Sequence, residues 1–555
     1  MSMRVSRKNF VVPPCTAVCP AGVDVPRYIR AVRDGLYDEA VAVLRERLPL
    51  PTICADACFA PCENVCAYKQ YGDPIAIRAL KRAAVDKGSD SWAGNKRQDA
   101  GTGKKVAIIG AGPTGLTAAY YLAMLGHRVK IIDAFPKPGG TMRYGIPRYR
   151  LTEERLDKDI ERILDRGVEF IGNMVVGDNV GFDEIKKQND AVFVASGANC
   201  SIRIPLAGGE KKGVFWGWEF LRDVSLGKAV SVGAKVAVIG SGNTAIDAAL
   251  TARRLGARRI DLFTRKKKED MLAHPREIAI AEEEGIFINP EWAPKKVVGE
   301  DKVEGLGLIR CSSVFDEKTC NYDPIYDEEI THRIEADTII LAAGQEPALE
   351  FLNSCDSKVK TARNRIEASG DDLSTSVPGV FAGGDVVTGP ASIILAVAQG
   401  RSAAIAIDKY LGGAGDITEI LAAPEDSVEV ADFAASVMNP QPRNELRHLR
   451  VWERVLGFDH VELPLSDEQI KAEASRCLNC DARKFEVKLA QEMCKDCGYC
   501  AEVCQVGTFG ASAVFNQKGY QPMEVKSADH CVGCLRCFFS CPDFAIDVRE
   551  ATSSE

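Results

Sequence analysis

Cysteine spacing constrains this chain more than any other feature of its sequence. Sixteen of the 20 cysteines fall into groups with the spacing of iron–sulfur ligands. The clearest groups lie near the end of the chain, where two runs follow the pattern C-x2-C-x2-C-x3-C and the second run ends in Cys541-Pro542. In such a pair, the first three thiolates of each run hold one 4Fe-4S cluster and the fourth thiolate holds the other. The pattern therefore predicts a short segment wrapped around two clusters.

The two runs resemble a bacterial two-cluster ferredoxin, and they predict which thiols share a cluster. Ferredoxin cluster 1 would take Cys494, Cys497, Cys500 and Cys541, and ferredoxin cluster 2 would take Cys531, Cys534, Cys537 and Cys504. One departure is Gln505, which stands where a proline normally follows the fourth cysteine. The competing interpretation is a pair of zinc sites, which needs only paired C-x2-C units. Two complete runs in register favour the clusters.

Length and charge narrow the class of protein. A chain of 555 residues predicts three or four domains. The net charge of -8 gives no reason to expect a nucleic-acid partner. The sequence begins with no apolar core of signal-peptide length and contains no run that approaches a membrane span, so we expect a cytoplasmic protein. In that reducing compartment, many cysteines indicate metal or redox roles rather than disulfides.

A first dinucleotide-binding signature follows the strand expected at 106–109. Its turn reads Gly110-Ala-Gly112-Pro113-Thr-Gly115 and leads into a helical pattern. The glycines permit a tight turn and a close backbone approach, and the start of the helix offers amides to a pyrophosphate. The next strand ends at Asp133, where a carboxylate can accept a hydrogen bond from a ribose hydroxyl.

A second signature follows the strand expected at 236–239, so two nucleotides are implied. Its turn and first helical residues are Gly240, Gly242, Asn243, Thr244 and Ala245. Alanine is allowed as the third small residue, because that position mainly sets how closely the helix packs.

The strand after the second signature ends without an acid. It is followed by Arg265 and Lys266, the first of four consecutive basic residues. An arginine at this place can accommodate a 2'-phosphate, which favours NADPH over NADH. The alternative is that the basic run is simply a solvated loop.

With both signatures in view, residues 10–480 resemble the small subunit of bacterial glutamate synthase and the N-terminal half of dihydropyrimidine dehydrogenase. These are FAD-containing, NAD(P)H-linked reductases. The resemblance implies that Gly140, Thr141 and Arg143 lie near the flavin and that Gly384 and Asp385 contact the ribityl or pyrophosphate part of FAD. It also implies that the segment 337–344, which ends at Gly344, returns the chain from an inserted NAD(P) domain to the FAD domain.

The resemblance further implies a helical N-terminal region with two more clusters, although only six cysteines lie there. The family usually has an R-C-x2-C segment just upstream of Cys15, and this chain instead carries Arg476-Cys477-Leu-Asn-Cys480 after the flavin domains. We infer that the displaced segment folds back. The first helical cluster would then take Cys15, Cys66, Cys477 and Cys480.

The second helical cluster departs further from the family pattern. Cys19, Cys58 and Cys62 match family ligands, but Lys81 stands where the family often has a carboxylate or amide ligand. An ammonium cannot bind iron, so Cys54 is the available substitute. Whether this cluster is complete stays open, so we expect four clusters in the chain and at least three.

The remaining cysteines are Cys200, Cys311, Cys320 and Cys355. Isolated cysteines are usually small buried hydrophobic residues. Since none of them forms a close pair, the sequence gives no support to a dithiol mechanism like that of thioredoxin reductase. No catalytic acid, base or nucleophile stands out either.

We therefore expect a multi-domain protein with a helical iron–sulfur domain, two Rossmann-like α/β nucleotide-binding domains and an α+β ferredoxin-like domain. The expected boundaries are 1–100 for the helical domain, 101–230 and 346–415 for a discontinuous FAD domain, 231–345 for the inserted NAD(P) domain, 416–485 for a connector and 486–555 for the ferredoxin domain.

The expected function is electron transfer between NAD(P)(H) and a low-potential ferredoxin or partner enzyme. No substrate-reducing or amidotransferase domain is recognised, so a subunit of a larger complex, for example a 2-oxoacid oxidoreductase, is favoured. The alternatives are a free-standing or bifurcating NAD(P)H:ferredoxin oxidoreductase, a protein like the glutamate synthase small subunit and, more remotely, a nucleotide-binding scaffold or redox sensor. The sequence settles neither the direction of electron flow nor the choice of nicotinamide.

Overall fold

A computed structural model describes residues 3–6, 10–316, 321–353, 356, 358–430, 440–483, 485–504 and 506–551. The chain divides into two compact units. Unit 1 comprises Met1–Arg97, Thr418–Arg447 and Pro464–Glu555, and unit 2 comprises Gln98–Ile417 and His448–Leu463. The segment 416–485, expected as one connector, is thus shared between the two units.

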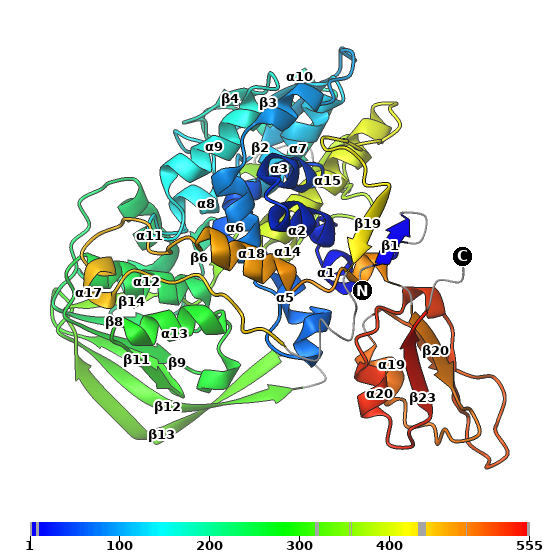
Figure 1. Ribbon diagram of the computed structural model, residues 1–555. Helices are drawn as coiled ribbons and strands as arrows, with labels where there is room; N and C mark the ends of the chain where they lie inside the picture. The colour runs from blue at the N-terminus through cyan, green and yellow to red at the C-terminus, as the bar shows by residue number, and fades with distance from the viewer. Residues whose placement is uncertain are drawn as a thin grey trace. The chain divides into compact units, whose positions relative to one another are not determined.

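Unit 2 contains two parallel five-stranded sheets, coloured from cyan to yellow in Figure 1. The first has the order β18-β5-β2-β3-β4. Its strands are β2 (Lys105–Ile109), β3 (Arg128–Ile132), β4 (Glu169–Ile171), β5 (Ala191–Val194) and β18 (Val380–Ala382). Because β18 pairs in parallel with β5 from far along the chain, this sheet is built from two separate stretches of sequence.

The second sheet has the order β10-β9-β8-β14-β7 and lies within the interval between those stretches. Its strands are β7 (Val214–Trp216), β8 (Lys235–Ile239), β9 (Arg259–Thr264), β10 (Ile286–Pro290) and β14 (Thr338–Leu341). Between β10 and β14 the chain makes an antiparallel sheet of β11 (Trp292–Val298), β12 (Gly305–Asp316) and β13 (Asn321–Glu335).

Helices cover both sheets of unit 2. Beside the first sheet lie α7 (Pro113–Met124), α8 (Thr141–Tyr144), α9 (Glu153–Leu164), α10 (Phe182–Gln188), α14 (Asp385–Thr388) and α15 (Ile393–Tyr410); beside the second lie α11 (Gly217–Ser225), α12 (Asn243–Arg254) and α13 (Pro275–Glu283). Gly400 lets α15 approach α7 closely, because a Cβ there would lie 2.5 Å from the carbonyl oxygen of Thr114. The inner strands β2, β5 and β8 are almost wholly apolar and buried, as expected for parallel strands covered on both faces.

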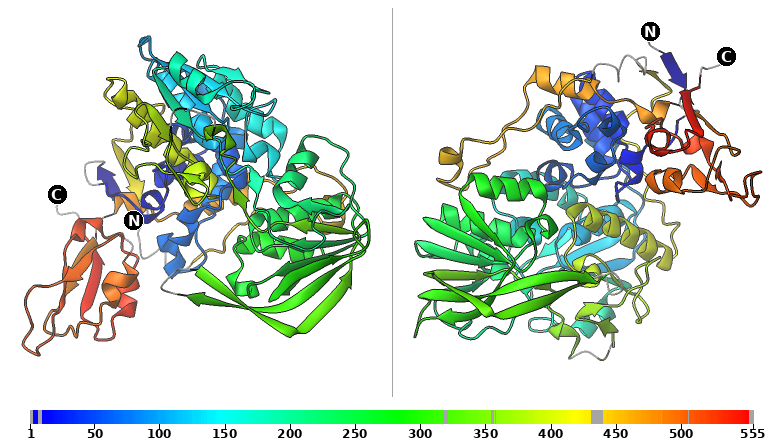
Figure 2. Two further views of the ribbon diagram at one scale, coloured as in Figure 1. Left: turned by 180° about the vertical axis from the view of Figure 1, so that it is seen from behind. Right: turned by 90° about the horizontal axis from the view of Figure 1, so that it is seen from below.

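Unit 1 joins a helical region with a small ferredoxin-like segment (Figure 2). The helices are α1 (Pro14–Ala17), α2 (Val25–Arg33), α3 (Tyr37–Arg45), α4 (Pro51–Ala57), α5 (Pro61–Asn64), α6 (Ile77–Lys87) and α18 (Asp467–Ser475). The ferredoxin-like segment pairs β20 (Phe485–Leu489) with β23 (Ile546–Glu550) and β21 (Phe509–Ala511) with β22 (Met523–Val525), and it carries the short helices α19 (Tyr499–Val503) and α20 (Arg536–Ser540).

Two contacts bind the first segment of unit 1 to its later segments. The strand β1 (Met3–Ser6) pairs antiparallel with β19 (Ser427–Val430). The buried guanidinium of Arg30 on α2 donates at 2.8 Å to the carboxylate of Asp481 and at 2.6 Å to that of Glu425. Within the described part of the chain, no helix is both long and apolar enough to cross a bilayer.

Candidate nucleotide and iron–sulfur sites

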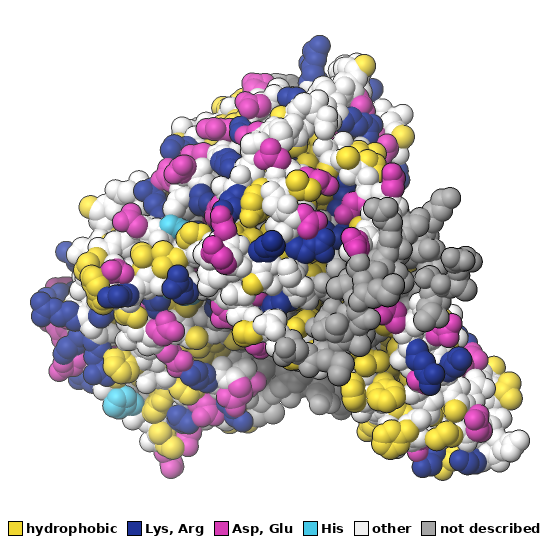
Figure 3. Space-filling view, viewed as in Figure 1, with side chains coloured by type: hydrophobic (Ala, Val, Ile, Leu, Met, Phe, Trp, Pro, Cys, Tyr) yellow, Lys and Arg dark blue, Asp and Glu magenta, His cyan; other side chains and the backbone are white. Residues whose placement is uncertain are grey.

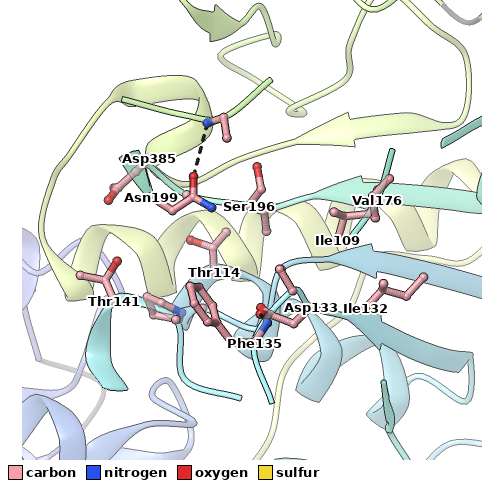
Figure 4. A pocket seen from close by; sticks show the side chains of 18 of the residues that line it. Ile109, Thr114, Ile132, Asp133, Phe135, Thr141, Val176, Ser196, Asn199 and Asp385 are labelled. Carbon is pink, nitrogen blue, oxygen red and sulfur yellow. Dashed lines mark hydrogen bonds between the residues drawn. The ribbon is translucent and has the colours of Figure 1, made fainter. Parts of the chain in front are cut away.

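A cavity of about 510 Å3 opens at the carboxyl ends of the first sheet. Figure 4 shows Asp133, Thr114, Thr141, Ser196 and Asp385 around it, contributed by five separate stretches of chain. This edge is where open parallel sheets bind nucleotides, because the loops after the strands and the starts of the helices meet there.

The glycine turn after β2 has the close contacts that the signature requires. A Cβ at Gly110, whose φ is 108°, would lie 2.4 Å from the carbonyl oxygen of Ala195. A Cβ at Gly115 would lie 2.0 Å from the carbonyl oxygen of Gly110. Gly112 precedes Pro113, the first residue of α7, and a Cβ there would meet nothing within 4 Å. The open space beside Gly112 and the start of α7 suits a pyrophosphate.

Asp133 lies in the cavity wall just after β3. Its carboxylate accepts hydrogen bonds from the backbone N–H groups of Ala111, at 2.6 Å, and Phe135, at 2.8 Å. Burial raises the pKa of Asp133, and these two hydrogen bonds oppose that shift. The carboxylate thus fixes the glycine turn and retains lone pairs for a ribose hydroxyl.

The opposite wall comes from Gly140 and Thr141 and from the turn after β18. Gly140 has φ 51°, and a Cβ there would lie 2.7 Å from the Cα of Gly112. Gly384 has φ 79°, and a Cβ there would lie 2.6 Å from the Oγ1 of Thr114. The two glycines therefore bring separate loops against the glycine turn.

Asp385 begins α14 and lines the cavity. Its Oδ1 accepts a hydrogen bond from the N–H of Ala391 at 3.2 Å. Burial raises the pKa of Asp385 to about 6, and that hydrogen bond lowers it only in part. A carboxylate held in such a wall favours a ligand that offers hydroxyl donors.

Two buried polar groups in the cavity wall support its fit to a flavin nucleotide. The Oγ of Ser196 and the Nε1–H of Trp218 find no hydrogen-bond partner among the described residues, and both side chains line the cavity. Buried polar groups normally have partners, so a ligand with both donors and acceptors would satisfy them. Sequence reasoning missed both residues; the small polar run 195–199, directly after β5, was the signal for Ser196.

The structure places Arg143 differently from the other residues expected near the flavin. Its buried guanidinium donates to the carbonyl oxygen of Pro138 at 2.7 Å and pairs with Asp157 and, at 3.7 Å, with Glu153. The side chain is not among those that line the cavity, and it holds the glycine loop against α9. Its contribution is to the shape of the wall.

The second glycine turn joins β8 to α12 in the second sheet. A Cβ at Gly240 would lie 2.4 Å from the carbonyl oxygen of Ala342 and 2.8 Å from the Cβ of Ala245. A Cβ at Gly242 would meet nothing within 4 Å, so the start of α12 is open. This turn therefore has the same cradle as the first one.

Side chains at the start of α12 tie this turn to neighbouring loops. Asn243 accepts a hydrogen bond at 3.0 Å from the N–H of His274. Thr244 accepts one at 3.4 Å from the side chain of Gln345, which follows Gly344 at φ 127°. The segment returning from the second sheet thus touches the turn directly.

Arg265 and Lys266 follow β9 at the same edge as the second glycine turn. Arg265 is exposed, and the N–H of Lys266 donates to Thr264 Oγ1 at 3.1 Å. Partial burial lowers the pKa of Lys266, and the neighbouring Arg265 charge lowers it further. The positive charges of these two side chains would favour binding of a ribose 2'-phosphate at this edge.

The ferredoxin-like segment gathers its eight cysteines as two groups. One small cavity is lined by Cys494, Cys497, Cys500 and Cys541, the residues expected to share ferredoxin cluster 1. Burial, and after it the charges of Cys534, Cys531 and Cys504, raise the pKa of Cys537 to about 12, so these four lie together as well. Gln505 lies outside the described residues.

The displaced R-C-x2-C segment reaches the helical region of the same unit. Cys15, Cys66, Cys477 and Cys480 line one small cavity. Burial raises the pKa of Cys15 well above its usual range, with the other three thiols among the further causes. These are the four residues expected for the first helical cluster, brought together from the first and third segments of unit 1.

Two buried side chains hold the returning segment in place. Glu473 accepts hydrogen bonds from the N–H groups of Ala76, at 2.8 Å, and Asn444, at 2.7 Å. Arg476 pairs with Glu473 at 2.5 Å, donates to the carbonyl oxygen of Asp73 at 2.5 Å and lies 4.7 Å from the ring centroid of Tyr68. The residue before Cys477 is thus anchored to the loop before α6.

The thiols expected for the second helical cluster surround Lys81. Burial alone would lower the pKa of this lysine, but the charges of Cys58, Cys54, Cys62 and Cys19 raise it. The side chain is buried on α6. Cys54 therefore lies in the same neighbourhood as the other three thiols, and the ammonium that replaces the family ligand lies among them.

The remaining cysteines lie apart from these groups. Cys311 is buried and Cys200 is half-buried, whereas Cys320 and Cys355 lie outside the described residues. Neither Cys200 nor Cys311 belongs to a group of three or more described His, Cys, Asp or Glu side chains that could bind a single metal ion.

Comparison with protein families matches three regions of the chain. Residues 104–400 match the pyridine nucleotide-disulphide oxidoreductase family, residues 9–92 match domain II of dihydropyrimidine dehydrogenase with its 4Fe-4S cluster, and residues 493–545 match the 4Fe-4S dicluster domain. The three matches together span the helical region, both sheets of unit 2 and the ferredoxin-like segment.

Curated relatives match over most of their own length. The chain is 37% identical to the beta subunit of the NADP(+)-dependent formate dehydrogenase of Moorella thermoacetica over 85% of this chain and 71% of the relative. It is 33% identical to the beta subunit of the NADPH-Fe(3+) oxidoreductase of Geobacter sulfurreducens, over 84% and 75%. It is 31% identical to the small chain of the NADPH glutamate synthase of Mycobacterium tuberculosis, over 72% and 86%.

Proposed function

We propose a function for this chain from the family to which it belongs, the pyridine nucleotide-disulphide oxidoreductases that carry a dihydropyrimidine dehydrogenase-like iron–sulfur domain and a 4Fe-4S dicluster domain. It is an FAD- and NAD(P)H-dependent oxidoreductase with iron–sulfur domains. Its proposed activity is to move electrons between NAD(P)(H) and a low-potential ferredoxin or partner enzyme. One observation carries this proposal: four thiols from the first and third segments of unit 1 line one cavity, in a chain that also has two glycine turns open to a nucleotide.

The cofactors supply the chemistry, and the residues described above bind and orient them. FAD accepts two electrons as a hydride from NAD(P)H and releases them singly, and each 4Fe-4S cluster takes one electron at a time. Gly112 and the start of α7 would hold the FAD pyrophosphate, with Asp133 and Asp385 toward its hydroxyls. Ser196 and Trp218 would contact its polar ring edge.

The nicotinamide nucleotide would bind at the second turn. The open space beside Gly242 would take its pyrophosphate, and Arg265 and Lys266 would neutralise the 2'-phosphate of NADPH. The sixteen thiols would hold four clusters, with Cys54 completing the second helical cluster. Electron flow in the reverse direction uses the same residues.

We place this chain in a larger redox complex. Two of its relatives are beta subunits by name, one of a formate dehydrogenase and one of an NADPH-Fe(3+) oxidoreductase. A partner subunit of this chain would bring the terminal substrate, for example formate or a 2-oxoacid. A free-standing or bifurcating NAD(P)H:ferredoxin oxidoreductase is the second candidate, and co-purification of further subunits separates the two.

The test is an anaerobic titration of the purified protein with NADPH and, separately, with NADH. Flavin bleaching is followed optically, and reduced clusters are followed by electron paramagnetic resonance. We expect one nucleotide to bleach the flavin, with cluster signals after it. If neither nucleotide bleaches the flavin, the proposed function is wrong.

A variant pair makes that titration specific to the second turn. An added Cβ at Gly242 meets no protein atom within 4 Å, so we expect the fold to tolerate Gly242→Val while the nucleotide loses its place. Its flavin should remain bound and bleach with dithionite but not with nucleotide. Gly101→Val fills an equally open position on the surface of the same unit and should behave as the wild type.

A further inference from the structure

A small cavity in unit 1 is lined by thiols of two different cysteine groups. Cys66 belongs to the first helical cluster, while Cys504 and Cys534 belong to ferredoxin cluster 2, and all three line a cavity of about 30 Å3. The other lining residues include Val506 and Val532. Thiols of the two groups thus face one small, partly apolar space.

Tyr71 joins the same two groups. It follows the 3-10 helix that begins after Cys66, and its hydroxyl donates to the carbonyl oxygen of Gly533 at 3.4 Å. Burial, and after it the charges of Cys534 and Cys480, raise the pKa of Tyr71 to about 12. One aromatic side chain thus lies within electrostatic reach of a thiol from each group.

Ferredoxin cluster 1 has a different environment. Its cavity is lined only by residues of the ferredoxin-like segment, between Leu489 and Ile546. Cys497 is exposed, as is Tyr499 beside it. Figure 3 shows hydrophobic side chains gathered on this segment, and the exposed ones include Phe515 and Phe544. The thiols of ferredoxin cluster 1 therefore lie toward solvent, whereas those of ferredoxin cluster 2 lie toward the helical region.

We propose that electrons cross between the helical region and the ferredoxin-like segment at the Tyr71–Gly533 junction, between the first helical cluster and ferredoxin cluster 2, and that ferredoxin cluster 1 is the outer terminus. The inference rests on the proposed function. In each crossing one electron moves and no bond breaks: the first helical cluster is oxidised as ferredoxin cluster 2 is reduced. NAD(P)H supplies the electrons, and an external one-electron iron–sulfur protein accepts them from cluster 1.

Charges at the junction fit this assignment. Lys69 and Arg536 line the cavity from its two sides, one from the helical region and one from α20. Reduction adds negative charge to a cluster, and a nearby cation stabilises that charge, more strongly at the half-buried Arg536 than at the exposed Lys69. Each side of the junction thus carries a cation that favours the electron-bearing state of the neighbouring cluster.

The test uses two matched variants of the whole chain. Cys531 and Cys494 are the first cysteines of their runs, and both are buried. Cys531→Ala removes a ligand of ferredoxin cluster 2, and Cys494→Ala removes a ligand of ferredoxin cluster 1. With NAD(P)H as reductant and rapid freezing, we expect cluster 2 to be reduced in Cys494→Ala, whereas in Cys531→Ala cluster 1 loses its reduction by nucleotide and keeps its reduction by dithionite.

A second measurement needs no nucleotide and separates this inference from the proposed function. In dithionite-reduced protein, each reduced cluster near the first helical cluster speeds its spin relaxation, and ferredoxin cluster 2 should be one of them. The relaxation rate should therefore be unchanged in Cys494→Ala and lower in Cys531→Ala, where only the contribution of the second helical cluster remains. The reverse pattern, or equal relaxation in both variants, overturns the junction. Failure of nucleotide to bleach the flavin, with the relaxation pattern intact, overturns only the proposed function.

Discussion

Replacing Glu473 with glutamine should release the segment that carries Cys477 and Cys480. The carboxylate is fully buried and accepts hydrogen bonds from Ala76 and Asn444 besides its ion pair with Arg476. Breaking a buried pair by removing one charge costs about 3–5 kcal/mol. Arg476 keeps its carbonyl partner on Asp73, and the amide oxygen of glutamine can still accept one bond, so we take the lower end of that range.

A cost of about 3 kcal/mol favours local opening on the order of 100-fold. The assay is iron loss to an excess of chelator, followed by the decay of the iron–sulfur absorbance under anaerobic conditions. The first helical cluster of Glu473→Gln should lose iron on the order of 100-fold faster than that of the wild type, while the clusters of the ferredoxin-like segment lose it at the normal rate.

The matched control lies on the same helix. Glu468 is exposed on α18, so Glu468→Gln should leave the rate unchanged. The reasoning is refuted if Glu473→Gln releases iron within twofold of the control, because the buried carboxylate would then contribute nothing to holding Cys477 and Cys480.

Three further predictions concern charge. The buried carboxyl of Asp385 has a pKa raised to about 6 from an ordinary value near 3.8, so the FAD-free protein should lose stability as pH rises from about 4 to 6. Asp385→Asn should remove that loss and be at most about 3 kcal/mol more stable at pH 7. Thermal unfolding across pH measures this gain, and equal curves for the two proteins would contradict it. Arg265→Ala should lower kcat/KM for NADPH by roughly 10- to 100-fold and leave NADH unaffected, with Lys268→Ala, which removes an ammonium paired to Glu282 at 2.5 Å, as the neutral control. Lys81→Met should lower the midpoint potential of the second helical cluster by on the order of 100 mV, whereas Lys81→Arg should retain it; a redox titration in which the two variants agree would contradict a role for the charge.

The sequence predicted the parts of the fold that depend on local patterns. The two glycine turns, their apolar strands and the two ferredoxin runs could be recognised because each is a short motif with fixed spacing. The discontinuous first sheet also followed from the family resemblance, and β18 pairs with β5 as that resemblance implies. The return of Cys477 and Cys480 was inferred from a ligand count, and the structure places both beside Cys15.

Other features depend on long-range packing that no local pattern encodes. Arg143 stands in a glycine motif near the cavity, but Asp157 and Glu153 on α9 draw its guanidinium away. The stretch 448–463 read as part of a connector, yet Arg454 pairs at 2.8 Å with Glu284, which also binds Arg254 at 2.6 Å, so this stretch packs with unit 2. Trp218 had no motif around it, and only the cavity reveals its position.

The wide sequence separation between Arg30 and Asp481 has a consequence for biosynthesis. Arg30 is buried, and its acidic partners lie at positions 425 and 481, so the helical region lacks these two countercharges until synthesis has passed position 481. At ribosomal rates, the ~450 residues between them take roughly 20 to 90 s to synthesise. During that interval the nucleotide-binding unit can fold first, while Cys15 and Cys66 are still without Cys477 and Cys480. Residues made hundreds of positions later thus close the helical region, so iron insertion at Cys15 comes as a late step in maturation.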